Sequence, residues 1–286
     1  MSTPALELPG TIPAAAQPRP APRVEPVPRP VAIGFAVLVY VFLYAPVIVM
    51  ALFSFNSGSV QSLPLKGFTL DWYDRLFSDS AMIDALAYSA KVSLVAVLIA
   101  VIAGTAFAML FTHVRLPGLR ILQALIALPF VTPGMVLGVS LLLAYKEVGI
   151  NAGFLAIVIA HVAFVTPIIM FVVAQRLAAL DPSLAQASMD LGAGRLRTFL
   201  EVTLPSIRTS LIAGALLAFT VSFDEVVVTF FVAGSEQTLP VHIWTLLRFG
   251  FSPSVNAILT IITVVSIAVV VLSTVVLAHG ERERGA

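Results

Sequence analysis

The sequence predicts an all-α integral membrane protein with six transmembrane helices, and three observations carry that prediction. The 286 residues are 59% hydrophobic and only 11% charged, whereas soluble domains carry about 25% charged residues. Six stretches each supply the roughly 20 mostly apolar residues that a helix needs to cross the hydrocarbon core. Lys and Arg gather on one side of these stretches, as the positive-inside rule expects.

The six predicted spans are separated by short polar or charged segments, and their limits follow from the length of each apolar run. They are residues 31–54, 89–112, 121–144, 152–173, 210–233 and 255–278. Four prolines inside them remove backbone donors and bend the helices. These bends suit either a bundle around an internal cavity or ordinary packing of bent helices. The prolines are Pro46, Pro129, Pro133 and Pro167.

The two ends of the chain are predicted to lie outside the membrane. Residues 1–30 hold nine of the 19 prolines and no apolar run, which predicts a disordered tail and excludes a signal peptide. Residues 31–279 form the predicted membrane domain, and residues 280–286 a short second tail. Eleven Lys and Arg residues fall on the side of both termini and five on the other. Both termini are therefore predicted to be cytoplasmic.

The longest predicted outside loop contains FTLDWYDRLF, residues 68–77. Trp72, Tyr73, Leu76 and Phe77 fall on one face of a helix. This pattern predicts a short helix at the membrane interface, where aromatic rings are favoured.

Several classes of site are excluded by composition and motif. No cysteine is present, so there is neither a disulfide nor a thiolate metal site, and the four histidines have no metal-binding spacing. The net charge of +1 argues against a nucleic-acid partner. None of the three lysines lies in a phosphate-binding loop. We therefore expect no catalytic residue, no metal and no ATPase site in this chain.

The loop between the fourth and fifth spans carries helix signals of its own. Asp181 is a favourable N-cap, and Pro182 suits the first helical position. Gly192 and Gly194 favour a turn that ends this helix. A second helix, residues 195–204, is predicted to stop at Pro205.

This loop resembles the EAA motif of ABC importer permeases. That motif is E-A-A, three residues, G, nine residues and I-x-L-P, and the spacing here is the same throughout. Gln186, Ser188 and Val202 replace the usual Glu, Ala and Ile. The matching positions are Gln186, Ala187, Ser188, Gly192, Leu204 and Pro205.

The resemblance implies a type I ABC importer permease fold with a cytoplasmic coupling helix between spans four and five. In that family the coupling helix is seated in a groove of the ATPase subunit. The implied partners are a homologous permease, two ATPase subunits that bind ATP and Mg²⁺, a periplasmic binding protein and the lipid of a bacterial inner membrane.

Three further stretches are similar to the spermidine/putrescine-type permease subfamily: FTLDWYDRLF, VSFDEVVVTFFVAG and LPVHIWTLLRFGFSPSVNAI. The resemblance implies import of polyamines. Another small solute, such as an amino-acid derivative, an opine-like compound or an organophosphonate, is the alternative within importers.

Asp224 and Glu225 lie inside the fifth predicted span, where ionised acids are costly and mark a pathway or a partner. With Thr220 and Phe223 they form the candidate substrate pathway, because carboxylates and aromatic faces attract ammonium groups. The alternative is structural, since Lys91 in the second span could pair with either acid.

His161 in the fourth span allows two interpretations. With the acids it could form a proton relay in a secondary transporter, although no internal repeat supports that class. A buried, hydrogen-bonded packing histidine is the preferred interpretation.

Overall fold

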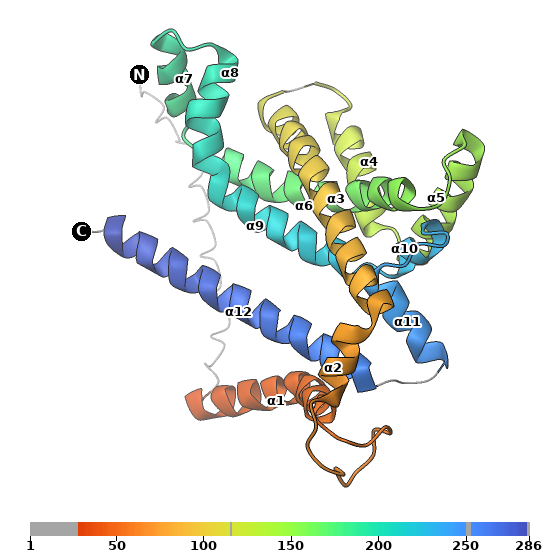
Figure 1. Ribbon diagram of the computed structural model, residues 1–286. Helices are drawn as coiled ribbons and strands as arrows, with labels where there is room; N and C mark the ends of the chain where they lie inside the picture. The colour runs from red at the N-terminus through yellow and green to blue at the C-terminus, as the bar shows by residue number, and fades with distance from the viewer. Residues whose placement is uncertain (1–27, 115, 250–252, 285–286) are drawn as a thin grey trace, which may run out of the picture. The chain divides into compact units, whose positions relative to one another are not determined.

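The computed structural model describes residues 28–114, 116–249 and 253–284, and these residues form helices joined by short connections (Figure 1). Most of the predicted proline-rich tail, up to residue 27, lies outside the described residues, as do residues 285–286. The chain divides into two units, Met1–Ile48 and Val49–Ala286. The described part of the first unit is the beginning of α1, Arg29–Ser54.

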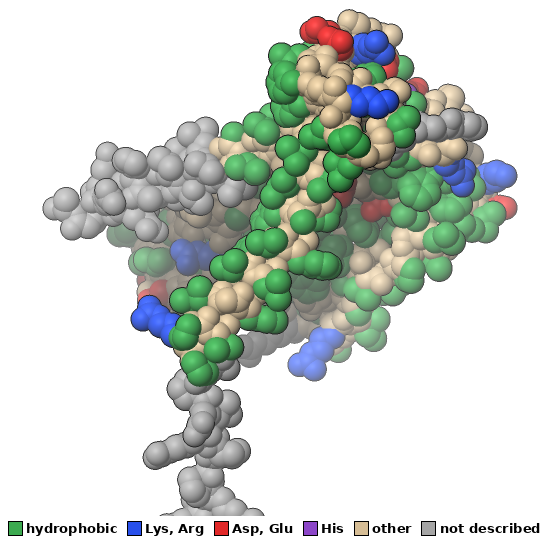
Figure 2. Space-filling view, turned by 90° about the horizontal axis from the view of Figure 1, so that it is seen from below, with side chains coloured by type: hydrophobic (Ala, Val, Ile, Leu, Met, Phe, Trp, Pro, Cys, Tyr) green, Lys and Arg blue, Asp and Glu red, His purple; other side chains and the backbone are tan. Residues whose placement is uncertain are grey.

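Four helical segments of the described chain are long and apolar enough to cross a membrane. Three are the helices α1, α3 (Ser80–His113) and α6 (Phe154–Ala178). The fourth is the run Arg195–Phe223, made of α8 (Arg195–Thr198), the π-helical turn η1 (Phe199–Thr203) and α9 (Leu204–Phe223). Hydrophobic side chains lie along the length of the helices visible in Figure 2, which suits contact with lipid.

The third predicted span, 121–144, is bent as its prolines predict, but so sharply that it forms two helices. It consists of α4 (Leu119–Val131) and α5 (Gly134–Val148), which are bent by 107°. Thr132 is extended because the residue before a proline is pushed out of the helical region, and Pro133 follows it. Counting this bent pair as one gives up to five spans.

The last helix, α12, runs from Pro253 to Arg284 and so continues past the predicted end of the sixth span. Its described apolar part, Pro253–Ala268, is shorter than a membrane crossing. The count of six spans therefore stays a prediction.

The packing of the second unit centres on α6, against which α3, α4 and α9 lie (Figure 1). A stripe of small residues on α3, spaced four apart, allows α3 to approach closely. A β-carbon added at Gly104 would lie 2.9 Å from Cβ of Ile169 and 3.0 Å from the carbonyl oxygen of Thr166. The stripe is Ala96, Ala100, Gly104 and Ala108, all buried.

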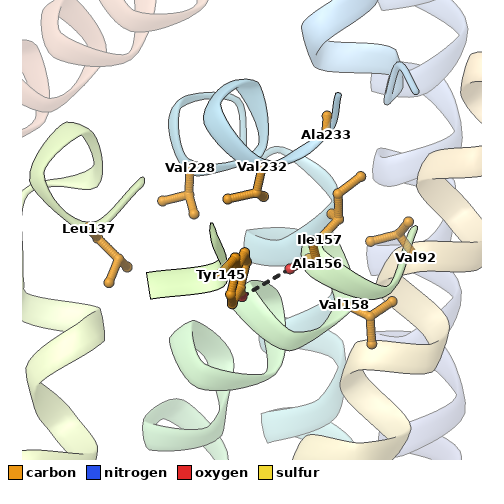
Figure 3. Packing of buried hydrophobic residues seen from close by; sticks show 10 residues of the cluster. Val92, Leu137, Tyr145, Ala156, Ile157, Val158, Val228, Val232 and Ala233 are labelled. Atoms are coloured by element: carbon orange, nitrogen blue, oxygen red, sulfur yellow. Dashed lines mark hydrogen bonds between the residues drawn. The ribbon is translucent and has the colours of Figure 1, made fainter. Parts of the chain in front are cut away.

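A second buried contact joins α5 and α6 to α10, the short helix Val227–Val232. Val228 and Val232 of α10 point toward Tyr145 of α5 (Figure 3). The Tyr145 hydroxyl donates a hydrogen bond of 3.1 Å to the carbonyl of Ala156, at the start of α6. Residues just beyond the end of α9 are thereby fixed against the bundle.

The predicted interfacial helix forms as α2, Asp71–Ser78, but its aromatic face is not free for lipid. Trp72 and Leu76 are buried among α3, α11 (Leu239–Phe249) and the beginning of α12. The indole N–H of Trp72 donates to the Asn56 carbonyl at 2.7 Å. Phe77, in contrast, is exposed.

The loop between α6 and α9 begins with α7, Pro182–Asp190, at the predicted position. The Asp181 carboxylate caps it by accepting the Ser183 N–H at 2.9 Å. The backbone hydrogen bond from Ser183, together with a second one from its side chain, lowers the pKa of Asp181 below its ordinary value. After the helix, Gly192 takes φ +88°, a left-handed conformation that glycine adopts without strain.

The predicted stop at Pro205 is wrong, because Pro205 lies in the first turn of α9 and the helix continues beyond it. A proline lacks the N–H that an α-helix would use at this point. The π-turn directly before α9 re-arranges the hydrogen bonds over Phe199–Thr203. The second helix of the loop and the fifth span are thus one continuous helical segment, Arg195–Phe223.

Gly104→Ala should destabilise the α3–α6 contact by about 1–3 kcal/mol, the usual cost of overpacking. The expected result is a lower Tm of the purified transporter. Gly214→Ala is the matched control, because its added β-carbon would lie 3.4 Å from the nearest atom, on Val172. Equal Tm values for the two variants would contradict the close contact.

Asp181→Ala should speed hydrogen exchange of the first α7 amides several-fold at pH 7, whereas Asp181→Asn, still an N-cap, should not. The folded-state pKa of Asp181 is lowered, so its stabilisation is present above the unfolded pKa of about 3.9 and is lost as pH falls through the folded pKa. Exchange followed by mass spectrometry at pH 7 checks the cap. Unchanged exchange in Asp181→Ala would show that the cap is not needed.

Candidate functional site

The two neighbouring acids lie in a break of the fifth span, which is a correction to the continuous helix predicted over 210–233. α9 ends at Phe223, Asp224 and Glu225 occupy the break, and α10 starts at Val227. The Asp224 N–H still bonds the Thr220 carbonyl at 3.1 Å, so Asp224 closes the last turn of α9. The acids are therefore placed by an interruption of the helix.

The break separates the roles of the two carboxylates. Asp224 is exposed and lines a cavity of about 650 Å³. The Glu225 carboxylate instead accepts the Val228 N–H at 2.8 Å. A freed backbone donor at the start of α10 is thus satisfied by the Glu225 side chain.

The cavity beside Asp224 is bounded by residues of α3, α9, α11 and α12, and its walls are mostly apolar. Phe219 and Phe223 of α9 stack with ring centroids 5.8 Å apart along one wall. Thr220 lies one turn before Asp224 and also faces the cavity. Among the described lining residues, Asp224 is the only one with an ionisable side chain.

This arrangement suits a cation with an apolar chain. A carboxylate in surroundings of low polarity attracts a positive group more strongly than it does in water. Aromatic faces add cation–π attraction, and the remaining wall accepts methylene groups. The predicted pathway residues Asp224, Phe223 and Thr220 are brought together here, while Glu225 turns to the backbone.

His161 of α6 is 2% exposed, and both of its ring nitrogens are hydrogen-bonded. Nδ1 lies 2.8 Å from the hydroxyl of Ser222, and Nε2 lies 2.9 Å from that of Thr229. No hydrogen bond joins it to either acid among the described contacts. The interpretation of His161 as a hydrogen-bonded packing residue is confirmed.

The proposed ion pair of Lys91 with the acids does not form. Its ammonium lies 4.8 Å from the ring centroid of Phe154, at the start of α6. Within the described part of the chain, the one ion pair at 4 Å or less is Arg197–Glu201, in the segment between α7 and α9. Lys91 consequently does not neutralise the Asp224 carboxylate in the cavity lining.

The residues of the EAA-like pattern fall at two places. Gln186, Ala187 and Gly192 are exposed on α7 and its turn, whereas Leu204 and Pro205 begin α9. Ser188 links the two parts, because its hydroxyl lies 3.0 Å from that of the buried Thr198 on α8.

The surface of this loop is apolar as well as exposed. Leu191 is 89% and Leu196 72% exposed, on either side of the turn at Gly192. Leu184 and Met189 of α7 are exposed too. A capped helix with apolar side chains turned outward at its tip is suited to contact a protein surface.

Sequence reasoning missed the second wall of the cavity. Trp244 and Leu247 of α11 and Ile262 of α12 face Asp224's cavity. The helical spacing of Trp244 and Leu247 marks an amphipathic face, but nothing in the sequence says which element that face meets. The sequence also does not reveal that Ser222 and Thr229 are the hydrogen-bond partners of His161, because these contacts join residues far apart in the chain.

Comparison with known proteins identifies the class. The family model of the binding-protein-dependent transport system inner membrane component matches residues 96–283. The spermidine/putrescine transport system permease protein PotC of Haemophilus influenzae is 36% identical over 244 residues, 85% of this chain and 95% of the relative. The putrescine transport system permease protein PotI of Escherichia coli K12 is 35% identical over 253 residues, 86% of this chain and 90% of the relative.

The fold is also that of a known transporter. The crystal structure of a bacterial ABC transporter involved in the import of the acidic polysaccharide alginate matches with a TM-score of 0.62 at 20% identity, covering 87% of this chain and 95% of that chain. The family model covers more than half of the chain, and both relatives exceed 30% identity. The chain therefore belongs to the binding-protein-dependent transport system inner membrane components, the permease subunits of ABC importers.

Proposed function

We propose that this chain forms part of the substrate pathway of a polyamine importer, with Asp224 as a binding point for an ammonium group of the substrate. The observation that carries the proposal is that Asp224 is the one carboxylate among the described lining residues of an aromatic, mostly apolar cavity. Putrescine and spermidine combine ammonium groups with methylene chains, so their chemistry matches both parts of this lining. The names of the relatives point to the same substrates.

Binding at Asp224 is expected to be weak, because an importer has to release its substrate. One carboxylate meets one ammonium group, so the other ammonium groups of a polyamine require water or a partner permease. The alternative solutes weighed from the sequence, an organophosphonate above all, fit an anionic cavity less well. A proton-coupled secondary transporter is not supported by membership of an ABC importer family.

The remaining subunits follow from the same family. A homologous permease, two ATPase subunits and a periplasmic binding protein complete the transporter, and ATP with Mg²⁺ is bound by the ATPases. We propose an inner-membrane location with both termini in the cytoplasm, supported by the distribution of Lys and Arg.

The ATPase contact is proposed at α7 and its turn, through Gln186, Ala187, Ser188 and Gly192. The exposed apolar tip at Leu191 and Leu196 supports this assignment. Leu204 and Pro205 begin the helix that leads from this tip toward Asp224. Motion of the ATPase would in this way reach the substrate cavity as a rigid-body movement.

Asp224→Asn should lower uptake of labelled putrescine or spermidine at least tenfold in cells that express the whole transporter. The reason is loss of the charge that meets the ammonium group. Glu225→Gln is the matched control: it also removes one acid, but its amide oxygen can still accept the Val228 N–H, so uptake should stay within about twofold.

Both variants must reach the membrane at the wild-type level, which immunoblots of the membrane fraction establish. Full uptake by Asp224→Asn would overturn the role given to Asp224. A wild-type transporter that carries neither compound would overturn the polyamine assignment but leave the importer class intact.

A further inference from the structure

His161 joins the two sides of the break that presents Asp224. Ser222 lies on the last turn of α9, and Thr229 lies on α10. All three side chains are buried, at 2% exposure or less. One imidazole from α6 therefore ties the end of one helix to the next.

The positions of the protons follow from the partners. The Thr229 hydroxyl donates to the Glu225 carbonyl at 3.0 Å, so its oxygen is free to accept from His161. His161 then carries its proton on Nε2, and Nδ1 accepts from the Ser222 hydroxyl. The result is a directed chain that ends on a backbone carbonyl, which fits a structural link better than proton transfer.

The link bridges the two sides of the break. Ser222 and Thr229 are seven positions apart in sequence, and the one imidazole of His161 is hydrogen-bonded to both. The link also fixes the Glu225 carbonyl, while the Glu225 carboxylate holds the Val228 N–H, so one backbone acceptor and one backbone donor of the break are satisfied by side chains.

We infer that His161 is a positioning residue, which holds the break between α9 and α10 and so keeps the Asp224 side chain directed into the cavity. The imidazole does not touch the substrate and acts through the backbone of residues 222–229. The consequence for transport rests on the proposed role of Asp224, but the effect on its orientation does not.

The absence of cysteine allows the orientation to be measured directly. Asp224→Cys places the only thiol of this chain at the break, and its reaction rate with a cationic methanethiosulfonate reports access from the cavity. In the assembled transporter in membrane vesicles, adding His161→Leu should slow labelling at least fivefold. His161→Gln retains an acceptor and a donor, and should stay within about twofold.

Two further variants keep the test independent of folding defects. Thr229→Val preserves shape but cuts one end of the link, and should also slow labelling at least fivefold. Tyr145→Phe removes a buried hydrogen bond near α10 that does not touch the break, and should change labelling by less than twofold. The labelling rate of His161→Leu or Thr229→Val remaining within twofold, at normal protein level, would overturn the inference.

Uptake then separates this inference from the proposed function. His161→Leu alone should lower polyamine uptake about tenfold, yet should add less than about twofold to the loss in Asp224→Asn, because both changes remove the same interaction. If the double variant instead loses uptake by the product of the two single-variant factors, His161 only supports folding. If Asp224→Asn transports normally while labelling still depends on His161, the role of Asp224 fails and the link stands.

Discussion

The constraint on which this structure depends is that a helix broken inside a membrane must have its freed backbone groups satisfied by the protein. Between α9 and α10, side chains take part in this. The Glu225 carboxylate accepts a hydrogen bond from the Val228 N–H, and the Thr229 hydroxyl donates one to the Glu225 carbonyl. His161, on the neighbouring helix α6, is hydrogen-bonded to that hydroxyl. Because these groups are satisfied, the chain can expose one acid at the break.

The same constraint explains why two adjacent acids are present. A single carboxylate could not both cap α10 and face the cavity, because its oxygens would be engaged by the backbone. Glu225 has the longer side chain, and its carboxylate accepts from the N–H of Val228, three residues further along the chain. Asp224 closes α9 and lines the cavity. Among the described residues, no side chain pairs with the negative charge beside Phe223 and Trp244.

Local signals predicted much of the fold but not its interruptions. Apolar runs located the helices α1, α3 and α6, and the N-cap at Asp181 located α7, since both depend on neighbouring residues. Pro133 marked a bend but not its size of 107°, which depends on packing. The break at Asp224 has no proline or glycine, and His161, which we infer holds it, lies 61 residues from Ser222 in sequence. The wall containing Trp244 likewise depends on tertiary contacts that periodicity does not reveal.

The continuity of η1 with α9 has a mechanical consequence. α9 has 20 residues, from Leu204 to Phe223, and is therefore about 30 Å long. One end of α9 adjoins the loop and the other end adjoins the acidic break, so a rigid-body tilt of this helix would move both. A tilt of roughly 10° about its midpoint shifts each end by about 3 Å in opposite directions. A hydrogen bond is broken by such a shift, so a small swing at the loop is large on the scale of an ammonium–carboxylate contact.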